Sequence, residues 1–258
     1  MTRTSPRSRR GFTLVELLVV LGVAGALLAL VLPAMRGARE QSRAVGCLNN
    51  LRQMMLAAQM YHHANDGRYP LATYWAYRPP IRVTYNWDYV ETRDSITGLR
   101  TIEPGTLWWA SAEKRVLQCP SFDGKSVGFT GDPYTGYNYN TSYVGREMDT
   151  AGRVPVPPAR ASQIRRPSET VVFGDGEYAA GANKFMRSPF PSPGELLSFG
   201  RFAGTQGFRH RGRTNAAFAD GHARGLSERH TSTVPGESDR IASRTGFLSV
   251  DNRLYDLD

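Results

Sequence analysis

Four side chains in the C-terminal half of the chain have the chemistry of a metal or hydrolytic site: Asp175, His210, Asp220 and His222. Imidazoles and carboxylates are common Zn²⁺ ligands and common general acids and bases. The sequence has no His-Glu-x-x-His, Gly-x-Ser-x-Gly or phosphate-loop motif to organise them. A Ca²⁺ site using Asp175, Glu177 or Asp220 is an alternative, since loop carbonyls can add oxygen ligands. We expect no enzyme activity, no catalytic residue, no cofactor and no metal.

A structural role for the same residues follows from the segment 215–223. We expect it to form a strand that turns at Asp220-Gly221, because Asp-Gly favours tight hairpins. In this interpretation Asp220 accepts backbone hydrogen bonds at the turn, and His210 connects the preceding loop to that turn. We expect this scaffold role rather than a site for chemistry.

The chain contains two cysteines, Cys47 and Cys119. Two are too few for a framework of disulfides or for a thiolate zinc site. In an extracytoplasmic domain they can form one bridge, whereas two buried free thiols would only fill space. The sequence leaves both alternatives open.

The N-terminal segment from Phe12 to Leu32 is apolar over 21 residues, with Glu16 as its one ionisable side chain. That length suits an α-helix crossing a hydrocarbon layer of ~30 Å. A secretory signal cleaved at Ala24-Gly25-Ala26 fits poorly, because the apolar run continues beyond Ala26. In a plain anchor, Thr13-x-x-Glu16 would be only a capping box at the helix start.

The residues 9–16, Arg-Arg-Gly-Phe-Thr-Leu-Val-Glu, resemble the cleavage and methylation signature of prepilins and pseudopilins. The resemblance implies that a prepilin peptidase cuts between Gly11 and Phe12 and that the new Phe12 amine is methylated. It implies that the apolar helix is retained and assembles with other pilin or pseudopilin subunits. An intramembrane carboxylate usually has a partner. We expect Glu16 to pair with the Phe12 amine of a neighbouring subunit.

The length and charge of the chain restrict its class. Beyond the first helix, just under 200 of the 258 residues remain, which is enough for one head domain with its own core. The formal charge is +9, and removing the four arginines of residues 1–11 leaves +5. The other arginines are scattered in sequence without a nucleic-acid motif, so we expect no nucleic-acid partner. The leader arginines favour a cytoplasmic N-terminus.

The elements that would position these residues are a long helix and a β-rich head. After Pro33, apolar residues recur at steps of three and four along one helical face, and Asn65-Asp66-Gly67 marks the end of the helix. Residues 81–91 alternate between apolar and polar and predict one strand with a buried face. Tyr137, Tyr139 and Tyr143 suggest another strand, and 170–173 a third.

A second resemblance concerns the segment 208–222. His210, nine further residues and then Asp220-Gly221 are similar to the His-x9-Asp-Gly motif of a family of prepilin-like proteins, and Asn215 and Phe218 also match. The same family resembles this chain at 47–53 and at Cys119-Pro120-Ser121. The resemblance implies a fold and a location rather than a mechanism.

These observations predict an α+β, pilin-like fold in which a long N-terminal helix packs on an antiparallel β-sheet head with long loops. We expect a cleaved leader at 1–11, a helix at 12–65 that crosses the membrane at 12–32, and a head at 66–258. The predicted function is a non-enzymatic pseudopilin-like subunit of a type II secretion or type IV pilus-like system, in the inner membrane with a periplasmic head. The alternative is a membrane-anchored protein that binds a glycan or an envelope protein through its head.

Overall fold

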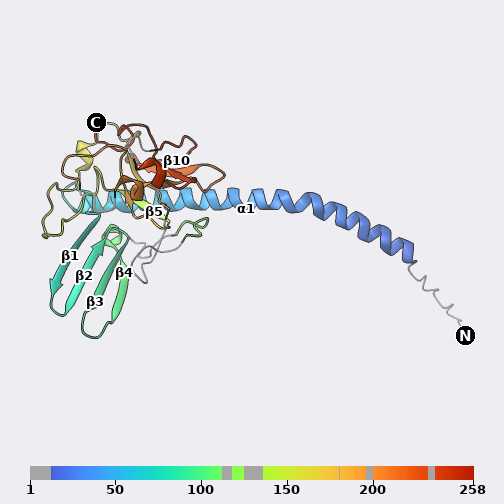
Figure 1. Ribbon diagram of the computed structural model, residues 1–258, viewed down its shortest axis with the longest axis horizontal. Helices are drawn as coiled ribbons and strands as arrows, with labels where there is room; N and C mark the ends of the chain where they lie inside the picture. Colours follow the sequence, from blue (N-terminus) through green and yellow to red (C-terminus); the bar gives the residue numbers. More distant parts are fainter. Residues whose placement is uncertain (1–12, 112–117, 125–135, 180, 196–199, 232–235) are drawn as a thin grey trace, which may run out of the picture. The chain divides into compact units, whose positions relative to one another are not determined.

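The computed structural model describes residues 13–111, 118–124, 136–179, 181–195, 200–231 and 236–258 (Figure 1). The predicted processing site at Gly11 and Phe12 lies outside the described residues. The structure combines one long helix with antiparallel and mixed sheets, so the α+β, pilin-like prediction is confirmed. Its helices and strands are α1 (Leu14–Ala64), β1 (Thr73–Arg78), β2 (Ile81–Asn86), β3 (Tyr89–Asp94), β4 (Arg100–Pro104), β5 (Tyr137–Asn140), β6 (Val171–Asp175), β7 (Phe185–Met186), β8 (Gln206–Gly207), β9 (Thr214–Phe218), β10 (Ala223–Leu226) and β11 (Thr245–Gly246). Short 3-10 helices are found at Thr106–Trp108, Ala161–Gln163, Arg201–Gly204 and Ser238–Arg240.

Helix α1 begins at Leu14, continues through Pro33 and ends at Ala64, one residue before the end expected from the sequence. The chain leaves the helix in a left-handed turn, with φ values of 55° at Asp66 and 73° at Gly67, and the Gly67 amide donates to the His62 carbonyl at 2.8 Å. Among the described residues, α1 is the one helix long and apolar enough to cross a membrane, by length and composition.

The C-terminal half of α1 packs inside the head. The chain divides into two compact units, residues 1–42 and 43–258, and the second unit holds this half of the helix. Leu51, Met55 and Ala58, which lie on the predicted apolar face, are fully buried. They share one hydrophobic core with aromatic residues of the head, including Tyr139 and Phe173.

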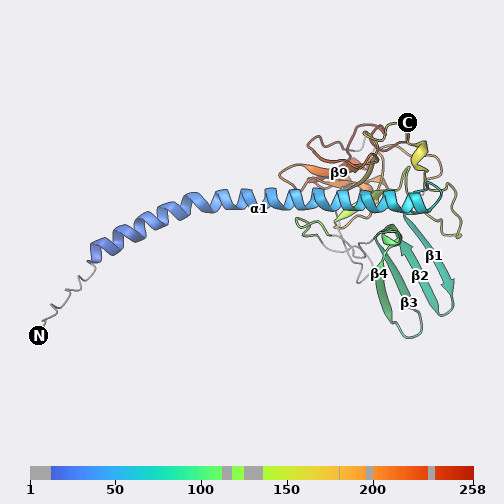
Figure 2. The same cartoon turned by 180° about the vertical axis from the view of Figure 1, so that it is seen from behind.

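A five-stranded sheet, in the order β10-β9-β6-β5-β7, provides the other side of this core. Its pairs are antiparallel except for β5 with β7. The strand predicted at 170–173 corresponds to β6, and β9 and β10 form the hairpin predicted at Asp220-Gly221. Of the three tyrosines expected in one strand, Tyr143 lies beyond the end of β5. Sheet β1-β2-β3-β4 extends away from α1 on the side opposite β9 and β10 (Figures 1 and 2).

The prediction of one strand over 81–91 is wrong, because the chain turns at Trp87 and Asp88 and forms the β2–β3 hairpin. The Trp87 ring is fully buried and its centroid lies 5.5 Å from that of Phe173, while its Nε1 donates to the Lys184 carbonyl at 3.1 Å. The buried carboxylate of Asp88 pairs with the Lys184 ammonium group. The apolar and polar alternation continues across Trp87 and Asp88, but the burial of these residues in the head makes the chain turn there.

Replacement of Gly221 by alanine is expected to destabilise the head. Gly221 has a φ of 100°, a conformation that costs a residue with a side chain about 1–3 kcal/mol. An added Cβ would also lie 3.2 Å from Nε2 of Gln59. We expect a lower unfolding temperature for the Gly221→Ala protein in detergent, measured by differential scanning fluorimetry.

The matched control is Gly225→Ala in the same hairpin. Gly225 does not have a positive φ, and an added Cβ would meet its neighbours at 3.4 Å or more. This change should be neutral or gain up to about 1 kcal/mol. Equal unfolding temperatures for the two variants would refute the role assigned to the turn.

Candidate functional site

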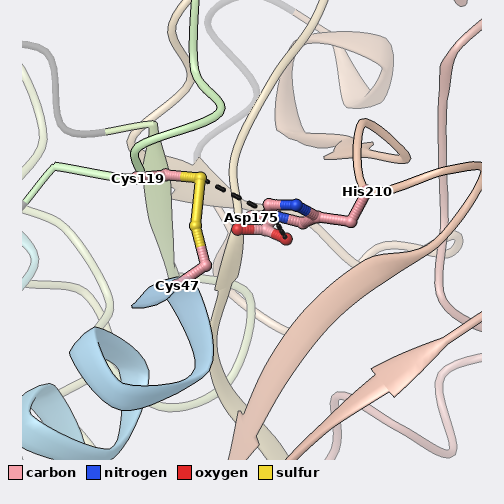
Figure 3. Close-up of side chains that lie close together, drawn as sticks. All are labelled: Cys47, Cys119, Asp175 and His210. Carbon is pink, nitrogen blue, oxygen red and sulfur yellow. Dashed lines mark hydrogen bonds and ion pairs between the residues drawn. A yellow bond between two sulfur atoms is a disulfide. The ribbon is translucent and has the colours of Figure 1, made fainter. Parts of the chain in front are cut away.

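The buried carboxylate of Asp175, at the end of β6, is the centre of the polar cluster in the head (Figure 3). Its Oδ2 accepts a hydrogen bond from the backbone N–H of Asn215 at 2.7 Å and lies 3.2 Å from Nε2 of His210. Its Oδ1 lies 3.3 Å from the Arg209 guanidinium. A buried carboxylate requires such partners, since an uncompensated charge in the interior costs several kcal/mol.

Arg209 connects Asp175 to the rest of the cluster. Its guanidinium also pairs with Glu177 at 3.2 Å and donates to the Gly136 carbonyl. An added Cβ at Gly207 would lie 2.4 Å from this guanidinium, so the backbone can approach the ion pair only because residue 207 is glycine. Arg209 therefore holds two carboxylates that would otherwise repel each other.

Cys47 of α1 and Cys119 are joined by a disulfide, with 5.2 Å between their Cα atoms. Of the two alternatives that the sequence leaves open, one disulfide or two free thiols, the structure has the disulfide. The bridge lies beside the imidazole of His210, whose Nε2 is 3.6 Å from Sγ of Cys119 (Figure 3). Both sulfur-bearing residues are buried, at 0% and 1% exposure.

Asn50, three residues after Cys47 in α1, makes a second contact with the segment that holds Cys119. Nδ2 of Asn50 donates to the Gln118 carbonyl at 3.1 Å and to the Tyr137 hydroxyl at 3.0 Å. Burial, and next the charge of Asp175, raise the pKa of Tyr137, so its hydroxyl stays protonated at neutral pH. One turn of helix is thus attached to the head by one covalent bond and two hydrogen bonds.

The ligand atoms of Cys47, Cys119, Asp175 and His210 all lie within 4.8 Å of one another, which is the spacing of a metal site. The sulfur atoms are already bonded to each other, however, and thiolates rather than disulfides ligate Zn²⁺. The Arg209 guanidinium pairs with both Asp175 and Glu177, and Arg244 also pairs with Glu177 at 2.5 Å; these cations oppose a Ca²⁺ ion there. In this oxidised form the cluster is built to link segments of chain.

The structure separates the histidine and aspartate that the sequence associates. His210 packs against Asp175 and the disulfide, whereas Asp220 lies in the β9–β10 turn. There the Asp220 carboxylate accepts from the backbone amide of His222 at 3.1 Å and lies 2.6 Å from Nδ1 of its ring. Asp220 has the predicted turn role, but the His210 side chain binds to Asp175 rather than to the turn.

The other residues of the predicted motif support the sheet. The backbone N–H of Asn215 donates to Asp175, and Phe218 is fully buried in β9. The Phe218 ring stacks on that of His222 with centroids 4.3 Å apart, and the Arg224 guanidinium lies 5.0 Å from its centroid. All of these contacts are structural.

Glu16 lies in the first turn of α1 and forms the predicted capping box. The Thr13 amide donates to Oε2 of Glu16 at 2.8 Å, and the Glu16 amide donates to Oγ1 of Thr13 at 3.2 Å. These bonds satisfy amide groups that the first turn of a helix leaves without partners. Capping by Glu16 within the chain is compatible with a further role between chains.

The sequence reasoning missed a surface on the four-stranded sheet. Trp75, Tyr77, Arg82 and Thr150 line an open depression of about 380 Å³. Three of the arginines that are scattered in sequence come together in this sheet, since the strand register places Arg82 opposite Arg93 and Arg93 opposite Arg100. The alternation in 81–86 does put Arg82 on the polar side of its strand, but the opposing strands could not be predicted from it.

Comparison with known families defines the class of the protein. Residues 6–32 match the family described as "prokaryotic N-terminal methylation motif". Together with an apolar helix that starts at Leu14, this match defines a prepilin-like protein with a single candidate membrane span among the described residues. No curated protein and no solved structure matched the sequence.

Residues 36–179 match the family described as "protein of unknown function (DUF1559)". The match covers more than half of the chain, and the protein belongs to this family. The matched segment contains Cys47, Cys119, Asp175 and the whole four-stranded sheet. It ends before His210, so the resemblance of 208–222 to a His-x9-Asp-Gly motif stays a prediction.

Loss of the disulfide is expected to destabilise the head strongly. The bridge spans a sequence separation of 72 residues, for which loop-closure entropy gives a stabilisation of about 4 kcal/mol. We expect a phosphine reductant to lower the unfolding temperature of the wild-type protein. The double variant Cys47→Ser/Cys119→Ser should start at that lower temperature and not respond to the reductant. A wild-type unfolding temperature that is unchanged on complete reduction, verified by thiol titration, would exclude a stabilising bridge.

Proposed function

We propose that this protein is a non-enzymatic, pseudopilin-like subunit of a type II secretion or type IV pilus-like system. In this proposal a prepilin peptidase cuts between Gly11 and Phe12, the N-terminal helix stays in the inner membrane, and the head is periplasmic. One observation carries the proposal: helix α1 begins within the residues that match a methylation motif, is apolar in its first half and is buried in the head by its second half. Such a helix can assemble in the membrane and carry a head outside it.

The buried polar cluster supports the non-enzymatic part of the proposal. His210 and Asp175 are 4% and 0% exposed, and both are engaged by neighbouring groups. A general base must reach the proton that it removes, directly or through one water molecule. Because His210 and Asp175 are buried beside a disulfide, they suit a structural role better than a catalytic one.

The alternative function, ligand binding by the head of an anchored protein, is favoured by one specific observation. The depression lined by Trp75, Tyr77, Arg82 and Thr150 is open to solvent and combines aromatic rings with a guanidinium group. The two functions are compatible, because the depression and the membrane segment belong to different parts of the chain.

Replacing Glu16 by glutamine tests the assembly role. Glutamine keeps an oxygen that can accept in the capping box, but it lacks the charge that would pair with a neighbour's Phe12 amine. We expect normal cleavage and methylation, with an intact mass that begins at N-methyl-Phe12, but assembly reduced at least tenfold in crosslinking of membranes. Wild-type crosslinking would restrict Glu16 to capping, and a mature chain that begins at Leu27 would refute the proposal.

A chelator experiment tests the non-enzymatic, metal-free role of the cluster. His210→Ala removes one buried partner of Asp175 and should cost about 1–3 kcal/mol, with or without EDTA. His222→Ala, at a half-exposed position, is the matched control and should cost less. A wild-type unfolding temperature that falls in EDTA and recovers with Zn²⁺ or Ca²⁺, while the His210→Ala protein does not respond, would support a metal site instead.

A further inference from the structure

One face of the four-stranded sheet carries a row of three arginines. In the strand register Arg82 lies opposite Arg93, and Arg93 lies opposite Arg100, while Tyr77 lies opposite Arg82. Directly opposite residues project from the same face of a sheet. We call this surface the arginine face; it comprises Trp75, Tyr77, Arg82, Thr84, Glu91, Arg93, Arg100 and Ile102.

Like charges directly opposite each other on neighbouring strands destabilise a sheet. Arg100 is compensated, because its Nε lies 2.9 Å from the Glu91 carboxylate. Arg82 and Arg93 are exposed, and within the ranges that the structure describes no ion pair is found for either. The Arg82 guanidinium lies 5.8 Å from the ring centroid of Trp75, an arrangement that orients it over the aromatic ring. The neighbouring guanidinium groups of Arg82 and Arg93 can therefore bind an anionic group.

The depression beside this row has a defined wall. Thr150 belongs to a turn in which the Asp149 carboxylate accepts from the amides of Ala151 and Arg153 at 2.9 and 2.8 Å. The turn is joined to the edge strand β1 through the Met148 amide, which donates to the Thr73 carbonyl at 3.0 Å. The depression is therefore held between a sheet and a fixed turn.

We propose that the arginine face binds an acidic glycan, that is, a chain of pyranose sugars carrying carboxylates. Trp75 and the 54% exposed Tyr77 offer apolar ring surfaces against which a sugar ring can pack. Arg82 and Arg93 donate charge-assisted hydrogen bonds to a carboxylate, the geometry for which guanidinium groups are suited. Thr150 donates to or accepts from a sugar hydroxyl. This binding does not depend on the proposed subunit function.

The acidic residue on the same face favours a glycan over a polyphosphate. Glu91 lies two positions from Arg93 in β3 and therefore on the same face of the sheet. Its carboxylate neutralises Arg100 and would repel a closely spaced row of phosphates. Nucleic-acid binding draws its affinity from the neutralisation of many phosphates. A sugar chain needs fewer charges, and its hydroxyls can donate to the carboxylate.

The test is calorimetric titration of the full-length protein in detergent micelles. The probes are a tetramer of galacturonic acid, its methyl ester, which has the same sugars without charge, and an oligothymidylate. We expect the acid to bind at least tenfold more tightly than the ester. Arg82→Gln and Arg93→Gln should each weaken binding of the acid about tenfold, and Tyr77→Ala should weaken binding of both sugars.

The matched control is Arg78→Gln, which makes the same change of charge on β1. Arg78 is exposed but lies opposite Ile81 and therefore on the other face of the sheet, so binding should be unchanged. The unfolding temperature of Arg93→Gln should equal or exceed that of the wild type, because a repulsion is removed; loss of binding then cannot come from unfolding.

Four results would overturn the proposal. They are equal affinity for the acid and its ester, tighter binding of the oligothymidylate, an equal loss of affinity in Arg78→Gln, and no binding of the acid at millimolar concentrations. The second result would identify a nucleic-acid surface instead. Each result leaves the membrane assembly of the subunit unaffected, so failure here is distinguishable from failure of the proposed function.

Discussion

One continuous helix has to satisfy two different surroundings, and most of the structure follows from this constraint. From Leu14 to Leu32 its side chains are exposed and, apart from Glu16, predominantly apolar, which suits a hydrocarbon environment. From Cys47 to Ala58 one face enters the core of the head while polar residues such as Arg52 stay outside. Because a helix keeps its hydrogen bonds within itself, it can pass from one environment to the other without unpaired backbone groups.

The head holds the second half of this helix through a polar cluster as well as through an apolar core. Asp175, Arg209 and the Cys47–Cys119 bridge lie next to the same turn of α1, and they join segments that are far apart in sequence. Hydrophobic contacts are not directional, whereas ion pairs and a disulfide fix one register of the helix against the sheet. In the structure, the contacts of Asp175, Arg209 and the bridge fix the position of the helix in the head.

Local patterns predicted the parts of the fold that depend on local physics. The buried helix face at Leu51 and Met55 could be predicted from the helical spacing of apolar residues, and the turn at Gly221 from the turn preference of Asp-Gly. Both signals act over only a few residues. The β2–β3 turn was missed because Trp87 continues the alternation while tertiary burial reverses the chain there. The pairing of Asp175 with His210 and the row of arginines depend on strand register between distant segments, which no local pattern contains.

The position of the disulfide also has a mechanical consequence. Among the described side chains of α1, Cys47 is the first buried one after the exposed apolar segment, so a pull on the anchor reaches this residue before it reaches Leu51 or Met55. The covalent bond passes the tension directly to Cys119 in the head. The apolar contacts further along the helix are then shielded from peeling, and extraction of the helix from the head requires a chemical bond to break.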